Sequence, residues 1–396
     1  MKAAKVAHLT SVHSPFDVRI FHKECKSLAQ HGYEVVLIAP HHTDEIADGV
    51  KVKALKQCQG RLSRMTLGAW RMFREALKQH ADIYHIHDPE LIPVALLLRM
   101  RGKQAIYDIH EDLPRTIPYK HYLPRWSRWP LMWIVERLEN AACPYFTALI
   151  TATWAIAERF RGKNSRITVV HNFPILDPHS PEAQFPWSKR EMAVVYIGSI
   201  TRNRGIVELM EAMSMLPNDV PLRLKLAGTF SPAELQDDMH ALPGWERVDY
   251  LGFLRRGQVA DLLGRVRAGL LVLHPEENYL RSMPIKLFEY MAAEIPVIAS
   301  DFPLWRQIIE AAGCGLLVDP LNPPTIAAAI ERLHNHPAEA EEMGKRGRAA
   351  LVLRYTWASE EERLKQLYES LVGDPAAANC MPAVTIQPHL STRETN

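Results

Sequence analysis

Cysteine is scarce in this chain, which has five cysteines among 396 residues, at positions 25, 58, 143, 314 and 380. The number is odd, the cysteines are widely scattered, and no two of them form a C-x-x-C pair. This pattern argues against a disulfide framework and against a cysteine-based zinc site. We therefore expect the protein to work in a reducing compartment, the cytoplasm.

Long hydrophobic runs and an excess of one charge are also lacking. No window is apolar enough for a transmembrane helix, and the first ten residues lead straight into a short strand-like segment, so we expect no secretory signal peptide. Lys and Arg number 47 against 45 Asp and Glu, a net charge of +2, which gives no general attraction to nucleic acid. Any electrostatic function has to be local.

The chain instead shows strands alternating with helices, twice over. Because 396 residues exceed what one hydrophobic core comfortably serves, we expect two α/β domains, each a doubly wound Rossmann-like parallel sheet, facing a central cleft. The expected divisions are an amino-terminal domain (1–173), a proline-rich linker (174–190), a carboxyl-terminal domain (191–355), a terminal helix (356–372) and a disordered tail (373–396).

In the amino-terminal half we expect strands at 6–10, 34–39, 83–86, 105–109, 149–151 and 167–170, with helices at 20–32 and 91–100. In the carboxyl-terminal half we expect strands at 193–197, 223–227, 248–251, 268–273, 296–299 and 315–318, with helices at 207–215, 257–264 and 286–293.

The segment 282–292, S-M-P-I-K-L-F-E-Y-M-A, is the most informative stretch. Pro284 suits a helix start, and Lys286, Glu289 and Tyr290 would then lie close together along one side of the helix. A helix amino end and a lysine attract phosphate, while a carboxylate accepts hydrogen bonds from a sugar diol. The pattern is typical of a sugar-nucleotide site, although Lys286 and Glu289 also fit a solvated helix pair.

Six motifs in order carry a family resemblance: H-L-T-S-V-H-S-P-F-D-V-R-I-F-H-K-E from His8, H-I-H-D-P-E from His85, Y-D-I-H-E-D from Tyr107, V-V-H-N-F-P from Val169, Y-I-G-S-I-T-R-N-R-G from Tyr196 and P-I-K-L-F-E-Y-M-A from Pro284. Over about residues 3–370 the chain resembles a bacterial retaining glycosyltransferase of family 4. The resemblance implies a GT-B fold, a nucleotide-diphosphate sugar as donor on the carboxyl-terminal domain, a saccharide or lipid-linked acceptor on the amino-terminal domain, and no required metal or other cofactor. It also implies a role in surface or extracellular polysaccharide synthesis.

The resemblance assigns the donor site residue by residue. Gly198 begins a loop close to the donor, Arg204 before Gly205 stands in the place of a diphosphate-binding lysine, and Glu289 is expected on the ribose. Two positions depart from the family pattern, because Ser199 replaces an arginine and Arg281 replaces the first of two glutamates. The remaining residues that we expect to bind the donor are Lys286, Leu287, Glu277 and Asn278. Glu276, Glu277 or Asn278 could supply the hydrogen-bond acceptor that is missing at position 281. The alternative for these three residues is a solvated loop.

On the amino-terminal side the resemblance places His110 near the reacting sugar, with Glu111 and Asp112 beside it. The loop from Thr10 to Asp17 would frame the acceptor. The expected acceptor residues are His13, Asp17, Arg19, Asp88 and Glu111. Alternatives remain for three of them: Asp17 and Arg19 could pair with each other, and Asp88, in the same motif as Glu90, could cap a helix.

The implied reaction is hexosyl transfer with retention, in which His110, Arg204 and Lys286 are the catalytic residues. Cations at the phosphates would stabilise the departing diphosphate. No carboxylate is placed as a covalent nucleophile, so same-face attack is preferred. A sugar-nucleotide epimerase and a non-catalytic nucleotide-sugar-binding member remain alternatives.

A stretch rich in basic and aromatic residues follows the H-E-D motif, between Arg115 and Trp133. This composition is typical of a peripheral contact with an anionic membrane, here the inner face of the cell membrane. An ordinary protein surface is the alternative. The sequence predicts no nucleic-acid partner.

Overall fold

The computed structural model describes residues 3–119, 123–176 and 185–373 and divides the chain into two units. The first unit comprises residues 1–171 together with 361–396, and the second comprises 172–360. The expected tail and the middle of the expected linker lie outside the described residues.

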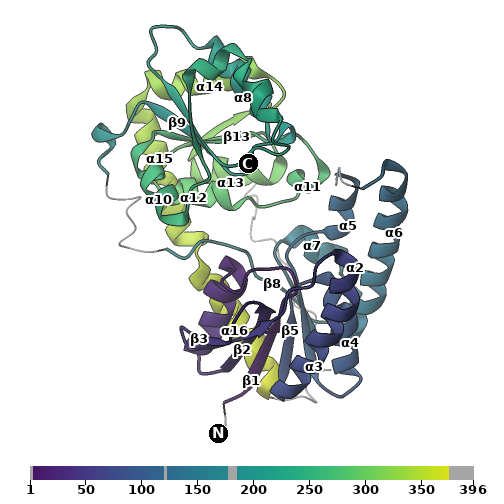
Figure 1. The fold of residues 1–396 in the computed structure, drawn as a ribbon. Helices are drawn as coiled ribbons and strands as arrows, with labels where there is room; N and C mark the ends of the chain where they lie inside the picture. Colours follow the sequence, from purple (N-terminus) through teal and green to yellow (C-terminus); the bar gives the residue numbers. More distant parts are fainter. Residues whose placement is uncertain (1–2, 120–122, 177–184, 374–396) are drawn as a thin grey trace, which may run out of the picture. The chain divides into compact units, whose positions relative to one another are not determined.

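The first unit contains an eight-stranded sheet in the order β3-β4-β2-β1-β5-β6-β7-β8 (Figure 1). Only the edge pair β3–β4 is antiparallel. The strands are β1 (Lys5–Leu9), β2 (Glu34–Pro40), β3 (Glu45–Ala47), β4 (Val50–Leu55), β5 (Ile83–Ile86), β6 (Gln104–Ile109), β7 (Ala148–Thr151) and β8 (Ile167–Val169). The sequence analysis placed six of these strands and missed the short β3 and β4.

Helices cover both faces of this sheet. They are η1 (Val18–Cys25), α1 (Lys26–Gln30), α2 (Arg61–Ser63), η2 (Arg64–Gly68), α3 (Ala69–Gln79), η3 (Pro89–Leu91), α4 (Ile92–Arg99), α5 (Leu113–Thr116), η4 (Ile117–Tyr119), α6 (Arg125–Ala142), η5 (Cys143–Tyr145) and α7 (Trp154–Arg159). The expected α-helix at 20–32 is instead a π-helix, η1, followed by the short α1. A π-helix joins residues five apart, as His22 N–H to Asp17 O does here.

The second unit contains a six-stranded, all-parallel sheet in the order β11-β10-β9-β12-β13-β14. The strands are β9 (Ala193–Ile197), β10 (Arg223–Ala227), β11 (Val248–Gly252), β12 (Ala268–Leu271), β13 (Val297–Ser300) and β14 (Gly315–Val318), all of which the sequence predicted. Along β9, Val194 and Tyr196 enter one hydrophobic core while Val195 and Ile197 enter the other. This alternation shows that both faces of the sheet are buried, as a doubly wound fold requires.

The helices of this unit are η7 (Trp187–Lys189), η8 (Arg202–Arg204), α8 (Ile206–Met215), α9 (Leu235–His240), η9 (Pro243–Arg247), α10 (Arg256–Arg265), α11 (Glu277–Leu280), α12 (Ile285–Ala292), α13 (Pro303–Ala312), α14 (Pro323–Asn335) and α15 (Pro337–Arg354). The last helix, α16 (Trp357–Gly373), begins in the second unit and from Glu361 belongs to the first. There Figure 1 shows it, in yellow, beside the purple β1 and β2.

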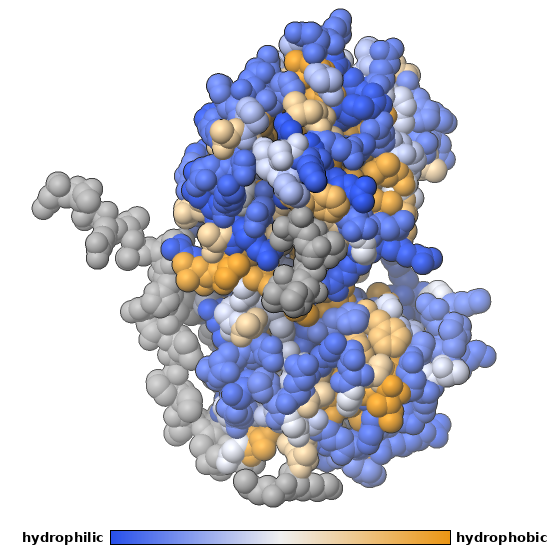
Figure 2. All heavy atoms as spheres, turned by 90° about the vertical axis from the view of Figure 1, so that its left-hand side faces the viewer, coloured by the Kyte–Doolittle hydropathy of each residue, from blue (hydrophilic) through white to orange (hydrophobic). Residues whose placement is uncertain are grey.

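Hydrophilic residues predominate on the face drawn in Figure 2, with hydrophobic residues in separate patches. Among the described residues, no helix is both long and apolar enough to cross a membrane.

Candidate active site

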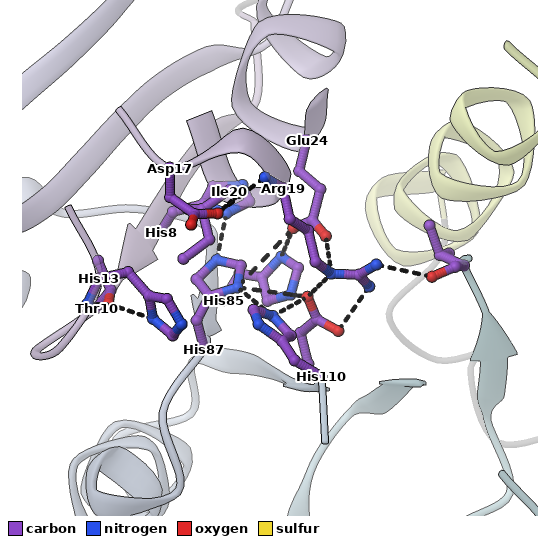
Figure 3. Close-up of polar contacts among 12 residues, drawn as sticks. His8, Thr10, His13, Asp17, Arg19, Ile20, Glu24, His85, His87 and His110 are labelled. Carbon is purple, nitrogen blue, oxygen red and sulfur yellow. Dashed lines mark hydrogen bonds and ion pairs between the residues drawn. The ribbon is translucent and has the colours of Figure 1, made fainter. Parts of the chain in front are cut away.

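Three neighbouring strands of the first unit, β1, β5 and β6, carry the amino-terminal motifs. His8 on β1 and His85 on β5 are partners in the parallel register. Thr10, His87 and His110 follow the carboxyl ends of these strands, so the three motifs meet at one edge of the sheet (Figure 3). The sequence predicted this edge because it placed each motif at a strand end.

Asp88 holds the loop that follows β1. Its carboxylate accepts hydrogen bonds from Ser11 N (2.6 Å) and Thr10 Oγ1 (2.8 Å) and pairs with His13 Nδ1 at 3.0 Å. Burial alone would raise the pKa of Asp88, but these donors, His13 foremost, hold it well below its usual range. Burial opposes the charge on His13 as well, and Asp88 nevertheless raises the pKa of that imidazole. The helix-cap alternative for Asp88 is wrong, since its side chain makes no cap bond to η3.

Arg19 lies inside the unit rather than at an acceptor surface. Its side chain is 4 % exposed, and it donates from Nε and Nη2 to the two oxygens of Asp108, at 3.0 and 2.9 Å. The Asp17 carboxylate caps η1 by accepting from the backbone N–H groups of Arg19 and Ile20, while the Arg19 guanidinium binds Asp108. A direct contact between Arg19 and an acceptor hydroxyl is therefore inconsistent with this burial.

Glu24 is a buried acid that ends the first motif and to which the sequence analysis gave no role. The π-helix brings it onto the same side as Arg19, with Oε1 3.0 Å from Arg19 Nε. Burial, with Asp108 nearby, raises the pKa of Glu24 well above its usual value, although the Arg19 guanidinium opposes this shift. The signal in the sequence was its position five residues after Arg19, which an α-helix would not have turned to the same side.

Four histidines surround this pair of acids. His8 Nδ1 lies 2.9 Å from His87 Nε2, and His87 Nδ1 lies 3.3 Å from His110 Nε2. His85 Nδ1 lies 2.8 Å from the hydroxyl of Tyr368 on α16. Burial lowers the pKa of His87 to about 4 and lowers those of His8 and His85 well below the usual value. These three imidazoles are therefore neutral at pH 7.

Two groups in this cluster have enough ligand atoms for a metal ion by distance alone. One is His8, Glu24, His85 and His87, and the other is His87, Asp108 and His110, with ligand atoms within 4.8 Å of one another. A guanidinium already lies within 3.0 Å of the oxygens of both acids. The cluster thus holds a cation of its own.

His110 is the member of the cluster nearest to solvent, with an 18 % exposed side chain whose Nε2 lies 2.7 Å from Asp108 Oδ2. Glu111 is exposed, and Asp112 pairs with Arg115 at 3.0 Å and with Arg159. His110 and Glu111 are thus open to a ligand, whereas Asp112 is occupied by two arginines.

In the second unit, the loop after β9 brings backbone close to a cation. Gly198 has φ of +137° and Gly205 has φ of +71°. A Cβ at Gly205 would lie 2.4 Å from Val272 O, and one at Gly198 would lie 3.3 Å from Arg204 Nη1. The positive φ at both positions favours glycine, and Ser199 between them is exposed.

A second loop, after β12, is tied to this one by residues that the sequence analysis missed. His274 donates from its backbone to Asn203 O at 3.0 Å, and its Nε2 lies 3.0 Å from Glu208 Oε1. Asn203 also donates to Glu276 Oε1 at 3.1 Å. Asn203 lies in the motif that starts at Tyr196 but was given no role, and Glu208 lies in no motif, because only the fold brings positions about 70 residues apart together.

The candidates for the missing hexose contact are partly occupied. Arg281, which replaces the family's glutamate, pairs with Glu277 at 2.8 Å, one helical turn earlier. Glu276 accepts a hydrogen bond from the side-chain amide of Asn203. The half-exposed Asn278 follows Glu277 on α11.

Helix α12 presents Lys286 and Glu289 together, with Nζ 2.8 Å from Oε2 and side chains 30 % and 32 % exposed. The sequence analysis expected Tyr290 on the same side as Lys286 and Glu289, and this is wrong. Tyr290 is fully buried and donates to Leu270 O at 3.2 Å. Leu287 is also fully buried, so its side chain is unavailable to a donor. The helix thus offers one ion pair, and its opposite face packs in the core.

The basic and aromatic stretch falls largely on α6, at the outer edge of the first unit in Figure 1. Trp126, Trp129 and Trp133 are 81, 66 and 55 % exposed. Arg137 lies over the Trp133 ring at 4.8 Å, whereas Arg128 donates to the carbonyls of Leu123 and Pro118. Lys120, His121 and Tyr122 lie outside the described residues.

Comparison with known families agrees with this geometry. Residues 18–174 match the model of Glycosyltransferase Family 4, and residues 181–350 match that of Glycosyl transferases group 1. The chain is a GT-B glycosyltransferase of the family 4 type.

Individual glycosyltransferases show the same relationship at low identity. The D-rhamnosyltransferase WbpZ of Pseudomonas aeruginosa is 25 % identical over 289 residues, 72 % of each chain. The MMP alpha-(1→4)-mannosyltransferase of Mycolicibacterium hassiacum is 21 % identical over 322 residues, 76 % of this chain and 73 % of that protein.

Solved structures share the fold. Sucrose-phosphate synthase from Thermosynechococcus elongatus superposes with a TM-score of 0.74 at 18 % identity, covering 93 % of this chain and 99 % of that one. Anabaena HepE, solved with UDP and glucose, gives 0.68 at 14 % identity and covers 93 and 100 %. The expected GT-B fold class is confirmed.

Proposed function

We propose that this glycosyltransferase moves a hexosyl unit from a nucleotide-diphosphate sugar to a saccharide or lipid-linked saccharide acceptor, with retention of configuration, in the synthesis of a bacterial surface or extracellular polysaccharide. The observation that carries the proposal is Arg204, a guanidinium beside the glycine backbone at 198. Backbone without side chains and a planar cation together suit a diphosphate. The HepE structures with UDP and with UDP-glucose support a nucleotide-sugar donor.

The proposed chemistry depends on charge at the leaving group. As the bond to the anomeric carbon breaks, negative charge grows on the diphosphate, and Arg204 and Lys286 stabilise it more strongly in the transition state than in the bound donor. Lys286 leaves Glu289 to do so, which frees the carboxylate to accept hydrogen bonds from the ribose. The acceptor attacks from the same face, and the leaving phosphate takes its proton.

On the acceptor side, we assign two kinds of role. His110 and the exposed Glu111 contact the reacting sugars. Asp88 and Asp17 shape the surrounding loops, because their carboxylates bind loop and helix N–H groups, while His13 stands at the rim with a 31 % exposed side chain.

We also propose that α6 contacts an anionic membrane, where a lipid-linked acceptor would be presented. Trp126, Trp129, Trp133 and Arg137 recur at intervals of three and four residues, so they share one side of the helix. Exposed tryptophans beside an arginine suit the headgroup region of a bilayer.

The test is a panel of sugar nucleotides incubated with the full chain, with and without lipid-linked saccharide acceptors, with nucleotide release and product configuration followed by NMR. Nucleotide release that requires an acceptor, with the donor's configuration kept in the product, supports the proposal. Isomerised sugar nucleotide without acceptor would instead identify an epimerase, and donor binding without any turnover would identify a non-catalytic member. An inverted product would overturn the retaining mechanism alone.

A further inference from the structure

We propose that Asp108, which accepts two hydrogen bonds from Arg19, is a positioning residue. It keeps His110 as the Nε2–H tautomer, so that the lone pair on Nδ1 of His110 is available to the substrate. This inference rests on the proposed catalytic role of His110. It concerns a buried network that no motif assigned. The network lies within the first unit, between β1, β5, β6 and the π-helix η1 (Figure 3).

The argument begins with the carboxylate. An ionised carboxylate can only accept hydrogen bonds, so a nitrogen 2.7 Å from Asp108 Oδ2 must carry the proton. That nitrogen is Nε2 of His110. In its neutral form the His110 imidazole has one N–H, so Nδ1 is then unprotonated, and the described residues provide Nδ1 with no hydrogen-bond partner.

Asp108 must stay ionised for this logic to hold. It is fully buried, which alone would raise its pKa, but Arg19 first and His110 second hold the pKa well below its usual range. Arg19 grips both oxygens in a bidentate fork and donates its Nη1 to Val170 O at 2.9 Å. The fork fixes the carboxylate plane as well as its charge.

Two neighbours of the pair have pKa values shifted toward their neutral forms. Burial raises the pKa of Glu24 well above its usual value and lowers the pKa of His87 to about 4, so His87 is a neutral imidazole at pH 7. His87 Nε2 lies 2.9 Å from His8 Nδ1, with the two rings within 14° of parallel. Within the Arg19–Asp108 pair, one guanidinium thus balances one carboxylate.

The same balance argues against a metal ion in the cluster. A divalent ion among His87, Asp108 and His110 would share Oδ2 of Asp108 with Arg19 Nε, which is 3.0 Å away. Two cations on one oxygen repel each other strongly in a buried site. The Arg19 guanidinium already supplies the positive charge that balances Asp108.

Nitrogen-15 NMR of the histidine-labelled wild-type protein measures the tautomer in the unmodified chain, and a variant serves only to assign the signals. The His110 signals are assigned by their loss in His110→Gln. We expect a protonated Nε2 and an unprotonated Nδ1 at pH 7.5, unchanged when one equivalent of Zn²⁺ is added. A protonated Nδ1, or a shift of the His87 and His110 signals on adding zinc, would overturn the proposal.

Asp108→Asn then tests the consequence. An amide can donate to Nε2 and so favours the opposite tautomer, and turnover should fall on the order of 100-fold with little change in the donor KM. Arg19→Lys, which keeps the charge and loses the fork, should give a smaller fall. Tyr368→Phe is the matched control, because it removes a hydrogen bond of His85 elsewhere in the network, and it should leave both tautomer and turnover unchanged.

The catalytic role of His110 and the positioning role of Asp108 can be refuted independently of each other. A correct tautomer with wild-type turnover in His110→Gln would refute the catalytic role of His110 and leave the tautomer assignment standing. Unchanged turnover and an unchanged His110 tautomer in Asp108→Asn would refute the positioning role even if His110 is essential.

Discussion

The hydroxyl of Tyr368 lies 2.8 Å from Nδ1 of His85, although the two residues are 283 positions apart. Tyr368 is fully buried and also contacts Tyr33 edge to face. Another residue of α16, Leu371, accepts from Gln104 Nε2 through its carbonyl at 2.9 Å. The last helix thus completes the first unit behind its buried histidines.

We therefore expect Tyr368→Phe to lower the free energy of unfolding by about 1 kcal/mol, the typical worth of one hydrogen bond. Tyr368→Ala should lower it by about 3–5 kcal/mol, because a cavity is added. Urea unfolding followed by circular dichroism measures both. Val372→Ala, at a 45 % exposed position on the same helix, is the control and should stay within about 0.5 kcal/mol.

Glu289→Gln should weaken donor binding by about 1.5–3 kcal/mol, since a charged acceptor for the ribose hydroxyls is lost while the shape is kept. Calorimetric titration with the preferred sugar nucleotide measures the change. Glu310→Gln, which breaks an exposed pair with Arg306 at 2.8 Å, should bind like wild type. Equal affinities in all three proteins would show that Glu289 does not hold the ribose.

Arg204→Ala and Lys286→Ala should each reduce turnover more than they reduce binding of the bare nucleoside. The reason is that the charge these cations stabilise grows in the transition state. Arg202→Ala, in the same turn but paired with Asp238 at 2.5 Å, is the matched control. Wild-type turnover in both test variants would exclude the clamp.

The buried histidines should make the protein sensitive to mild acid. Burial lowers the pKa of His87 to about 4, against about 6.5 in an unfolded chain. As pH falls from 6.5 toward 4, His87 binds a proton in the unfolded state but not in the native state. The free energy of unfolding therefore decreases, by about 3 kcal/mol for His87 alone. His13, whose pKa is raised, contributes in the opposite sense.

Chemical denaturation at several pH values measures this slope. His87→Asn should flatten it, whereas His42→Asn, at an exposed position, should reproduce the wild-type slope. Identical slopes in the two variants would contradict the assignment to His87.

Liposome flotation tests the contact of α6 with membrane. Binding should appear with anionic vesicles, fall as salt rises, and drop sharply when Trp126, Trp129 and Trp133 are replaced by serine. Phe253→Ser removes a 78 % exposed aromatic residue from the second unit and is the control. Failure to float with anionic lipid at low salt would mean that α6 is an ordinary surface.

The sequence by itself determined the two parallel sheets and the order of the motifs along them. Continuously apolar strands such as 193–197 bury both faces, and polar residues such as His110 follow strand ends, which parallel pairing must bring to one edge. The glycines at 198 and 205 lie at positive φ in the structure, and the approach of Gly198 to a donor stays a prediction. These features are local, so one segment at a time reveals them.

Only the tertiary structure decided which partner each polar side chain takes. Arg19 could have paired with nearby Asp17, but burial against β6 gave it Asp108, 89 residues away, and a π-helix rather than an α-helix turned Glu24 toward it. Tyr290 appeared to share a side with Glu289, but packing over Gly269 and the bond to Leu270 O turned it into the core. Sequence spacing sets which residues can meet locally, whereas the cost of leaving a buried polar group unpaired selects the long-range partner.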